Sequence, residues 1–118
     1  MTKPGTDQSQ PVKFSILIGL VSTQDRQRIF EVLDAIENQA GDLSYEVIIA
    51  DRCQDDISEQ IDQRYPGVLR LPCPSNVSLP EMRTQALKQA TGRYIVVTED
   101  HCVPADHWLQ NFAREFER

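Results

Sequence analysis

The sequence predicts an α/β fold, a three-layer α/β/α sandwich built on a mainly parallel sheet. Short runs rich in apolar and β-branched residues alternate along the chain with segments whose apolar residues recur at helical spacing. The strand-like runs are almost continuously apolar, as in parallel strands that are covered by helices on both faces. Strands and helices that alternate in this way form parallel sheets with right-handed crossovers.

The predicted sheet begins with the run FSILIGLV, residues 14–21, which is typical of a buried strand. A helix follows and ends at Gln39, because apolar residues from Ile29 to Ile36 recur three and four apart. Gly41 closes this helix. Three polar residues can cap its start: Ser22, Thr23 and Asp25.

The middle of the chain supplies a strand, a helix and another strand. Residues 45–50 (YEVIIA) form a second buried strand that ends on Asp51. A helix then begins at residue 55 or 56 and ends at 64, where Pro66-Gly67 stops it. Residues 68–71 form a short third strand.

The last third repeats the alternation. Residues 79–90 form a helix with Pro80 early in it and Gly92 just past its end, the usual asymmetry of these two residue types. The run at 94–97 is a buried strand, and residues 106–117 form a final helix with an apolar stripe.

Composition favours one compact domain, residues 13–118, preceded by a disordered tail at 1–12 that has almost nothing apolar to bury. The chain carries 12 basic and 18 acidic residues, a net charge of −6, so we expect no nucleic-acid partner. No run approaches the roughly 20 apolar residues of a membrane span. The three cysteines form no CxxC motif, which favours a reducing, cytoplasmic location.

Polar residues follow the 94–97 strand directly. Thr98, Glu99, Asp100 and His101 form a cluster that the strand carries to the carboxyl edge of the sheet, where open parallel sheets bind ligands. We expect four loops to converge at this edge: 21–23, 51–56, 73–78 and 99–104.

Glu99 and His101 lie two apart, so an extended chain points both side chains the same way and Asp100 the opposite way. One carboxylate oxygen and one imidazole nitrogen can hold a divalent cation with positions left open for a phosphorylated substrate. In the alternative, the acids form a solvated turn and His101 is incidental; with no third ligand visible, spacing alone favours this alternative. Cys102 is close enough to be a ligand, although the cysteines are interpreted as small apolar residues.

Two further residues have two open interpretations each. Asp51 ends a strand, where its carboxylate can accept hydrogen bonds from a base or a sugar hydroxyl, or can cap the following helix. Arg83 lies on the 79–90 helix, where it makes a bidentate phosphate contact if it faces the sheet edge and is otherwise an exposed helix charge.

The order of three motifs resembles the family-2 glycosyltransferases of the GT-A fold. FSILIG and a helix ending in Asn38-Gln39 resemble the opening strand and helix of that family. YEVIIADRCQDD is similar to its acidic segment after the second strand. LPEMRTQALKQATGRYIVVTEDHCVPADHWL is similar to its motif aRNaGl..a.G.yi.flDaDc.p...wL. The chain therefore resembles the N-terminal, nucleotide-sugar-binding part, a Rossmann-like half of the GT-A fold.

The resemblance implies roles for five residues. Asp51 would contact the nucleotide base, and Arg83 would lie near the diphosphate. Glu99-Asp100-His101 would occupy the DxD position, where Glu99 and Asp100 bind the nucleotide sugar, and Glu99 and His101 ligate Mn²⁺ or Mg²⁺. The donor would be a UDP- or GDP-sugar.

The sequence departs from the family pattern at several of these positions. His101 replaces an Asp of the DxD, and its softer nitrogen favours Mn²⁺ over Mg²⁺ or weakens metal binding. Arg52, Cys53 and Gln54 replace Asp, Gly and Ser of the acidic segment, and Thr84 replaces the Asn of the aRN pattern.

Two functions follow as hypotheses. The first is a glycosyltransferase, or its donor-binding part, that transfers a sugar from a nucleotide-sugar donor with a divalent metal. The alternative is a non-catalytic nucleotide-binding or interaction module on the same scaffold. Family members continue with elements that bind the acceptor and supply the base, and no residue here matches that base. We expect a truncated domain whose open sheet edge pairs with a partner chain or a second copy as a homodimer.

Overall fold

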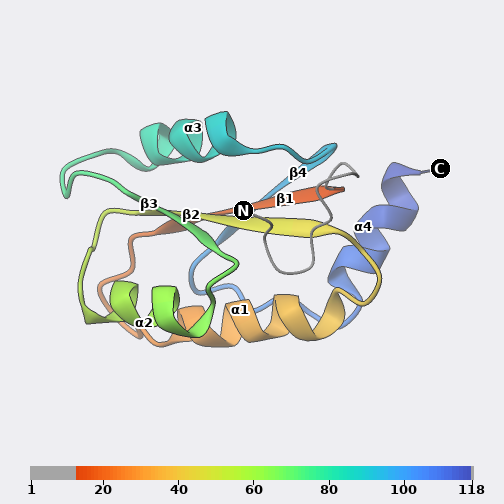
Figure 1. The fold of residues 1–118 in the computed structure, drawn as a ribbon, viewed down its shortest axis with the longest axis horizontal. Helices are drawn as coiled ribbons and strands as arrows, with labels where there is room; N and C mark the ends of the chain where they lie inside the picture. The colour runs from red at the N-terminus through yellow and green to blue at the C-terminus, as the bar shows by residue number, and fades with distance from the viewer. Residues whose placement is uncertain (1–12, 118) are drawn as a thin grey trace.

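The computed structural model describes residues 13–117, and the predicted alternation of strands and helices is present within them (Figure 1). The predicted tail at 1–12 lies outside the described residues. The elements in chain order are β1 Phe14–Leu20, α1 Arg28–Gln39, β2 Tyr45–Asp51, α2 Asp56–Arg64, β3 Leu69–Pro72, α3 Leu79–Gln89, β4 Tyr94–Glu99 and α4 Trp108–Phe116.

The four strands form one parallel sheet in the order β3-β2-β1-β4. In the ribbon of Figure 1, α3 lies on one face of the sheet, and α1 and α2 lie on the other. A smaller apolar cluster joins α3 to the sheet, and a larger one joins α1, α2 and α4 to it. The predicted α/β sandwich is therefore confirmed.

Strand β1 is the centre of both apolar clusters, and all seven of its residues are buried. Its alternate residues point to opposite faces, so Ile16 and Ile18 belong to the larger cluster and Leu17 to the smaller one. The continuous apolar run that predicted a strand covered on both faces is explained by this position between two helical layers.

Strand β4 is an edge strand, and the prediction that it is buried is wrong for one of its faces. Val96 is buried on the face toward α4, but Ile95 and Val97 on the opposite face are 38% and 50% exposed. Helix α3 packs on β1 and β2 and does not extend over β4. Strand β4 therefore leaves an apolar strip, Ile95 and Val97, open to solvent beside the unpaired edge.

The start of α1 also differs from the prediction. The helix begins at Arg28 after a turn, and Gln27 at the N-cap position makes no side-chain cap hydrogen bond. None of the predicted caps Ser22, Thr23 and Asp25 occupies that position, because the chain first makes a loop in which Asp25 has a positive φ of 52°. Residues 22–27 therefore form a loop at the carboxyl end of β1.

The other helix starts follow the expected chemistry more closely. Asp55 caps α2 in a capping box with Ser58. Ser78 caps α3, with Pro80 in the first turn. Helix α4 begins at Trp108 rather than at 106, because His107 has a left-handed backbone with φ of 65°.

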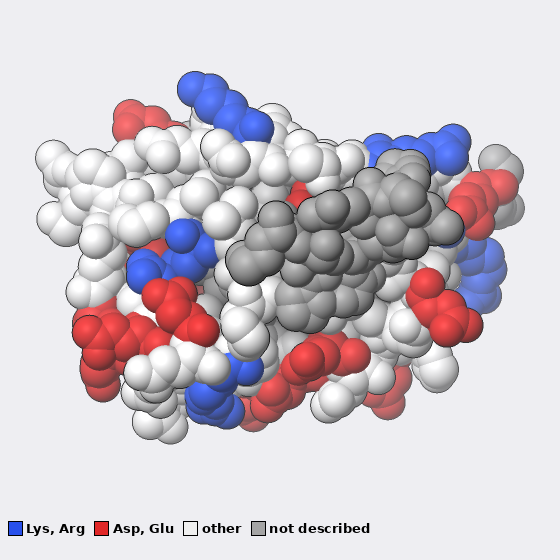
Figure 2. All heavy atoms as spheres, viewed as in Figure 1, with Lys and Arg blue, Asp and Glu red and all other residues white. Residues whose placement is uncertain are grey.

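On the face drawn in Figure 2, Lys and Arg side chains lie among acidic and uncharged ones and form no continuous basic surface there. Among residues 13–117, no helix combines the length and the apolar character that crossing a bilayer requires.

A buried polar network fixes the turn that leads into β4. The carboxylate of Glu46, 3% exposed, accepts hydrogen bonds from the Ser15 hydroxyl at 2.6 Å and from the backbone N–H of Thr91 at 2.7 Å. The N–H of Gly92 donates to the same Ser15 hydroxyl at 2.7 Å. A Cβ atom on Gly92 would lie 2.6 Å from the backbone nitrogen of Ser15 and 2.8 Å from the carbonyl carbon of Phe14.

We predict that Gly92→Ala lowers the free energy of unfolding by about 1–3 kcal/mol, because the added methyl group overlaps backbone that cannot rotate away. Gly19→Ala is the matched control: its methyl group would meet the ends of two flexible side chains, Leu79 at 2.7 Å and Met82 at 3.9 Å. Urea denaturation of both variants measures the difference. Equal losses in the two variants would contradict the proposed role of the close backbone approach.

Candidate functional site

Four loops meet at the carboxyl edge of the sheet, as expected, and hydrogen bonds join them. Asp100, directly after β4, links its loop to the one that follows β1. Its carboxylate accepts hydrogen bonds from the backbone N–H groups of Val21 at 2.9 Å and Ser22 at 2.8 Å, and from the Ser22 hydroxyl at 2.5 Å. The loops after neighbouring strands β1 and β4 are therefore held as one unit.

The loop after β2 is joined to both of its neighbours. Arg26, in the loop after β1, forms an ion pair with Asp55, in which its Nη2 donates to both carboxylate oxygens. Burial opposes the charge of Asp55, but Arg26 and the cap hydrogen bonds hold the pKa of Asp55 below its ordinary value. Arg52 donates to the carbonyl of Val77 at 2.9 Å, which ties in the loop after β3.

Asp100 is almost fully buried, with 3% of its surface exposed. Desolvation acts to raise the pKa of Asp100, but the hydrogen bonds from Ser22, Val21 and His101 outweigh it and hold the pKa below its ordinary value of 3.8. The interpretation of Asp100 as part of a solvated turn is therefore wrong. Its predicted contact with a nucleotide sugar stays a prediction, because protein groups already bind both of its oxygens.

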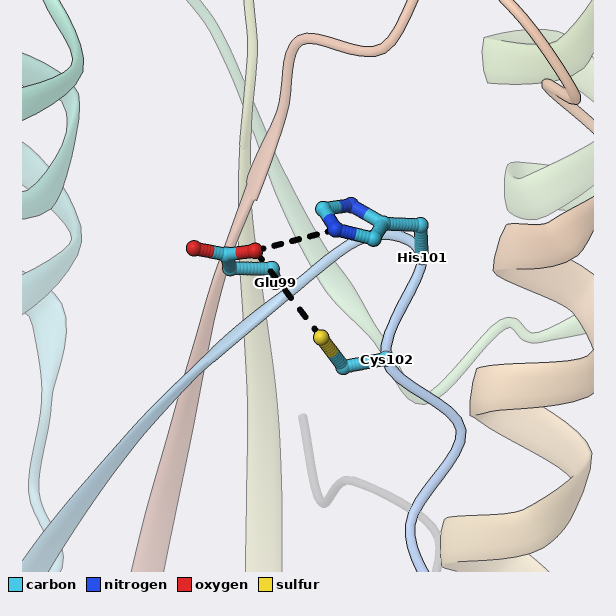
Figure 3. Close-up of side chains that lie close together, drawn as sticks. All are labelled: Glu99, His101 and Cys102. Atoms are coloured by element: carbon cyan, nitrogen blue, oxygen red, sulfur yellow. Dashed lines mark hydrogen bonds and ion pairs between the residues drawn. The ribbon is translucent and has the colours of Figure 1, made fainter.

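Glu99, His101 and Cys102 gather just beyond the end of β4 (Figure 3). The Nε2 atom of His101 lies 3.1 Å from Oε2 of Glu99, and the Sγ atom of Cys102 lies 3.8 Å from the same oxygen. A turn makes this approach possible, since the N–H of Cys102 donates to the carbonyl of Glu99. The extended chain that the spacing argument assumes ends at Glu99, so the turn brings the His101 ring to Glu99, and its Nδ1 also lies 3.2 Å from Oδ1 of Asp100.

The cysteines differ in their surroundings. Cys73 is buried, as a small apolar residue should be, and Cys53 is partly buried. Cys102 is exposed, so the apolar interpretation is wrong for this cysteine. Its thiol lies beside a carboxylate and an imidazole, and these three ligand atoms lie within 4.8 Å of one another.

Asp51 is completely buried at the end of β2. One carboxylate oxygen accepts the backbone N–H groups of Cys53 at 2.8 Å and Gln54 at 3.1 Å. The other accepts the Ser58 hydroxyl and the guanidinium of Arg70, the latter at 3.1 Å. Asp51 therefore shapes the loop after β2, whereas the cap of α2 is Asp55. Its predicted contact with the nucleotide base stays a prediction.

Arg83 lies in the first half of α3, and its side chain is partly buried. Its Nε atom is buried and has no hydrogen-bond partner among the residues that the structure describes. An unsatisfied buried donor is unusual in a folded protein. Its predicted place near a diphosphate stays a prediction.

Sequence reasoning missed three residues that build the site, Ser22, Arg26 and Arg70. Ser22 was interpreted as a helix cap, but it binds Asp100. The signal lies in the register of the neighbouring parallel strands: Gly19 on β1 pairs with Glu99 on β4, so the residues that follow both strands meet. That signal needs the strand order, which the sequence alone did not provide.

A cavity of about 300 Å³ lies away from this edge. Tyr45, the first residue of β2, and Arg64, the last residue of α2, line it together with apolar side chains. The cavity therefore opens near the amino ends of the strands. We place the candidate site at the carboxyl edge, because the ligand-type side chains lie there.

The parallel sheet, its helical layers and its joined carboxyl-edge loops define the chain as a Rossmann-like half of a GT-A fold. A scan against protein families matches "Glycosyl transferase family 2" over residues 19–118, most of the chain. The chain belongs to this family. A search of curated proteins found no significant match.

Solved structures of similar fold include S. aureus TarS. The structure of TarS 1-349 has a TM-score of 0.72 and 24% identity over 90% of this chain and 32% of that one. A second S. aureus TarS structure has a TM-score of 0.70 and 25% identity, and the match covers 90% of this chain and 20% of that one. The structure of a 4-diphosphocytidyl-2C-methyl-D-erythritol synthase has a TM-score of 0.57 and 12% identity, and the match covers 92% of this chain and 55% of that one. The chain thus spans a third or less of the TarS chains.

We predict that Ser22→Ala lowers the free energy of unfolding by about 1.5–3 kcal/mol at neutral pH, because it removes a hydrogen bond to the Asp100 carboxylate. As pH falls below about 4, the unfolded chain takes up the Asp100 proton before the folded chain does, so the stability from this carboxylate is lost. The difference in the free energy of unfolding between Ser22→Ala and wild type should therefore become smaller as the pH falls. Urea denaturation at about pH 7 and about pH 3 tests this.

Thr23→Ala, one residue along the same loop and exposed, is the control and should change little at either pH. If Ser22→Ala lowers the free energy of unfolding by the same amount at both pH values, the lost stability does not come from the charge of Asp100.

Proposed function

We propose that this chain is the donor-binding part of a glycosyltransferase, which transfers a sugar from a UDP- or GDP-sugar to an acceptor with the help of a divalent metal. The observation that carries the proposal is the pair Glu99 and His101, whose ligand atoms lie 3.1 Å apart at the carboxyl edge of the sheet. Membership of the family supports the reaction class.

The residues present fit a divalent cation. Glu99 offers a carboxylate oxygen and His101 an imidazole nitrogen, both on exposed side chains that a ligand can reach. Mn²⁺ accepts such a mixed set, whereas Mg²⁺ prefers an all-oxygen shell. When bound, the cation neutralises the charge that develops on a departing nucleoside diphosphate. Buried Asp100 anchors the turn that carries these two donors to the loop after β1.

Arg83 and Asp51 complete the proposed donor site. The unpartnered Nε of Arg83 supports a contact with a phosphate oxygen, since guanidinium groups bind phosphates through charged hydrogen bonds. Asp51 is proposed to lie under the base, with its carboxylate holding the loop that a base would contact. Asp100 is proposed to support the site by holding the His101 ring and the loop after β1. No catalytic base is assigned, and the acceptor is left open.

The second candidate is a non-catalytic nucleotide-binding or interaction module on the same scaffold. One observation favours it: the carboxylates of both Asp51 and Asp100 are bound by protein groups on each oxygen. In that function the two buried carboxylates stabilise the loops at the carboxyl ends of the strands, and the exposed surface of β4 binds a partner chain.

We predict that the wild-type chain binds UDP or GDP in a saturable way in the presence of Mn²⁺ and much more weakly without it. Glu99→Ala or His101→Ala should abolish this metal-dependent binding while leaving the fold intact, because both side chains are more than half exposed. Isothermal titration with each nucleotide, with and without Mn²⁺, measures the affinity, and circular dichroism checks the fold.

Glu37→Ala is the matched control, since Glu37 is an exposed acid beside the cavity near the amino ends of the strands. It should bind nucleotide as wild type does. No binding of either nucleotide to the wild-type chain at millimolar concentration would reject the donor site and leave the interaction module.

We also propose that a second copy of the chain covers the open edge of the sheet. Among residues 13–117, β4 pairs with β1 alone, and Ile95 and Val97 are exposed beside its other edge. Unpaired edges of this kind tend to be covered in native proteins.

Light scattering at micromolar concentration should then give twice the mass of one chain, and Val97→Lys, which places a charge on the exposed strip, should give a monomer. The same substitution of exposed Leu87 on α3 is a control that should leave the dimer intact. A wild-type monomer would contradict the homodimer.

A reducing, cytoplasmic location is proposed from the cysteines. All three carry free thiols in the structure, which fits a compartment where disulfides do not form.

A further inference from the structure

We propose that Cys102 is a third metal ligand beside Glu99 and His101, and that the site selects a borderline or thiophilic divalent cation of the Zn²⁺ class over Mg²⁺. This inference rests on the proposed role of Glu99 and His101 as metal ligands. It adds the third ligand and the class of metal that the three donors together prefer.

The three ligand atoms are already close enough for one ion. Figure 3 shows the Glu99 carboxylate facing both the imidazole ring of His101 and the thiol of Cys102. The separations from Glu99 Oε2 are 3.1 Å to the nitrogen and 3.8 Å to the sulfur. Ligand atoms bound to one tetrahedral Zn²⁺ lie about 3.3–3.6 Å from one another, given bond lengths near 2.0–2.3 Å. Small side-chain rotations on an exposed turn would bring all three to a common ion.

The imidazole is oriented as in a metal site. Nδ1 of His101 lies 3.2 Å from Oδ1 of buried Asp100. The other ring nitrogen, Nε2, lies 3.1 Å from Oε2 of Glu99, so each ring nitrogen faces one carboxylate. A carboxylate behind a ligating histidine is also the usual outer partner that fixes its tautomer.

The donor set decides the class of metal. Thiolate and imidazole are ligands that Zn²⁺ and Co²⁺ prefer, whereas Mg²⁺ prefers carboxylate, carbonyl and water oxygens. Binding forms a metal–sulfur bond and releases the thiol proton of Cys102 to solvent. Three protein ligands leave a fourth position open, the pattern of zinc sites that bind a substrate oxygen. The exposed side chains place that position toward solvent, where a phosphate oxygen of the proposed donor can reach it.

Titration of the full chain with Co²⁺ under anaerobic, reducing conditions tests the third ligand without any nucleotide. We expect a sulfur-to-cobalt charge-transfer band that saturates and that Zn²⁺ abolishes by displacement, while millimolar Mg²⁺ leaves it in place. Cys102→Ser should lose the band and bind Co²⁺ at least about tenfold more weakly. Cys53→Ser, a partly buried cysteine outside the cluster, is the matched control and should keep the band.

The outcomes separate this inference from the proposed function. Co²⁺ binding without the band, or a band that survives Cys102→Ser, would overturn the role of Cys102 and leave Glu99 and His101 as metal ligands. Displacement of Co²⁺ by Mg²⁺ as readily as by Zn²⁺ would overturn the metal preference. The absence of any Co²⁺ or Zn²⁺ binding by the wild-type chain would overturn the inference, while Mn²⁺-dependent binding of UDP or GDP tests the proposed function separately.

Discussion

The carboxyl edge of this domain depends on one buried carboxylate. Asp100 leaves the end of β4, turns inward and accepts two backbone N–H groups and a hydroxyl from the loop after β1. A buried carboxylate is stable only when it is fully hydrogen-bonded, so this loop and this acid must be placed together. Glu99 and His101, on either side of Asp100 in the chain, are both exposed, and the His101 ring contacts both carboxylates.

A second buried carboxylate organises the loop after β2. Asp51 is buried, binds the N–H groups of the loop that follows it and meets Arg70 from β3. Arg26 then joins this loop, through Asp55, to the loop after β1. Each of these acids is tied to a neighbouring loop by hydrogen bonds or an ion pair. Loops that are already held in place lose little freedom when a ligand arrives, which suits a binding site.

The sequence allowed the fold class and all eight elements to be predicted, because β1 and β2 are continuously apolar and the helices have clear periods. It did not allow the exposure of β4 to be predicted, since Ile95 and Val97 look like core residues until the strand order places them at an edge. The opposite directions of Glu99 and Asp100 followed from strand geometry alone. The partners of Asp100, and the approach of Cys102 to Glu99, depend on tertiary contacts and a turn that no local pattern encodes.

The candidate site and the exposed apolar strip belong to one surface. Along β4, Ile95, Val97 and Glu99 alternate with Val96 and so share the face that α3 leaves uncovered. A partner that buries Ile95 and Val97 therefore also lies next to Glu99. Removing water from that neighbourhood lowers the local dielectric and strengthens the attraction between the Glu99 carboxylate and a cation. In the proposed assembly, covering Ile95 and Val97 would therefore strengthen the proposed metal binding, because one strand presents both surfaces.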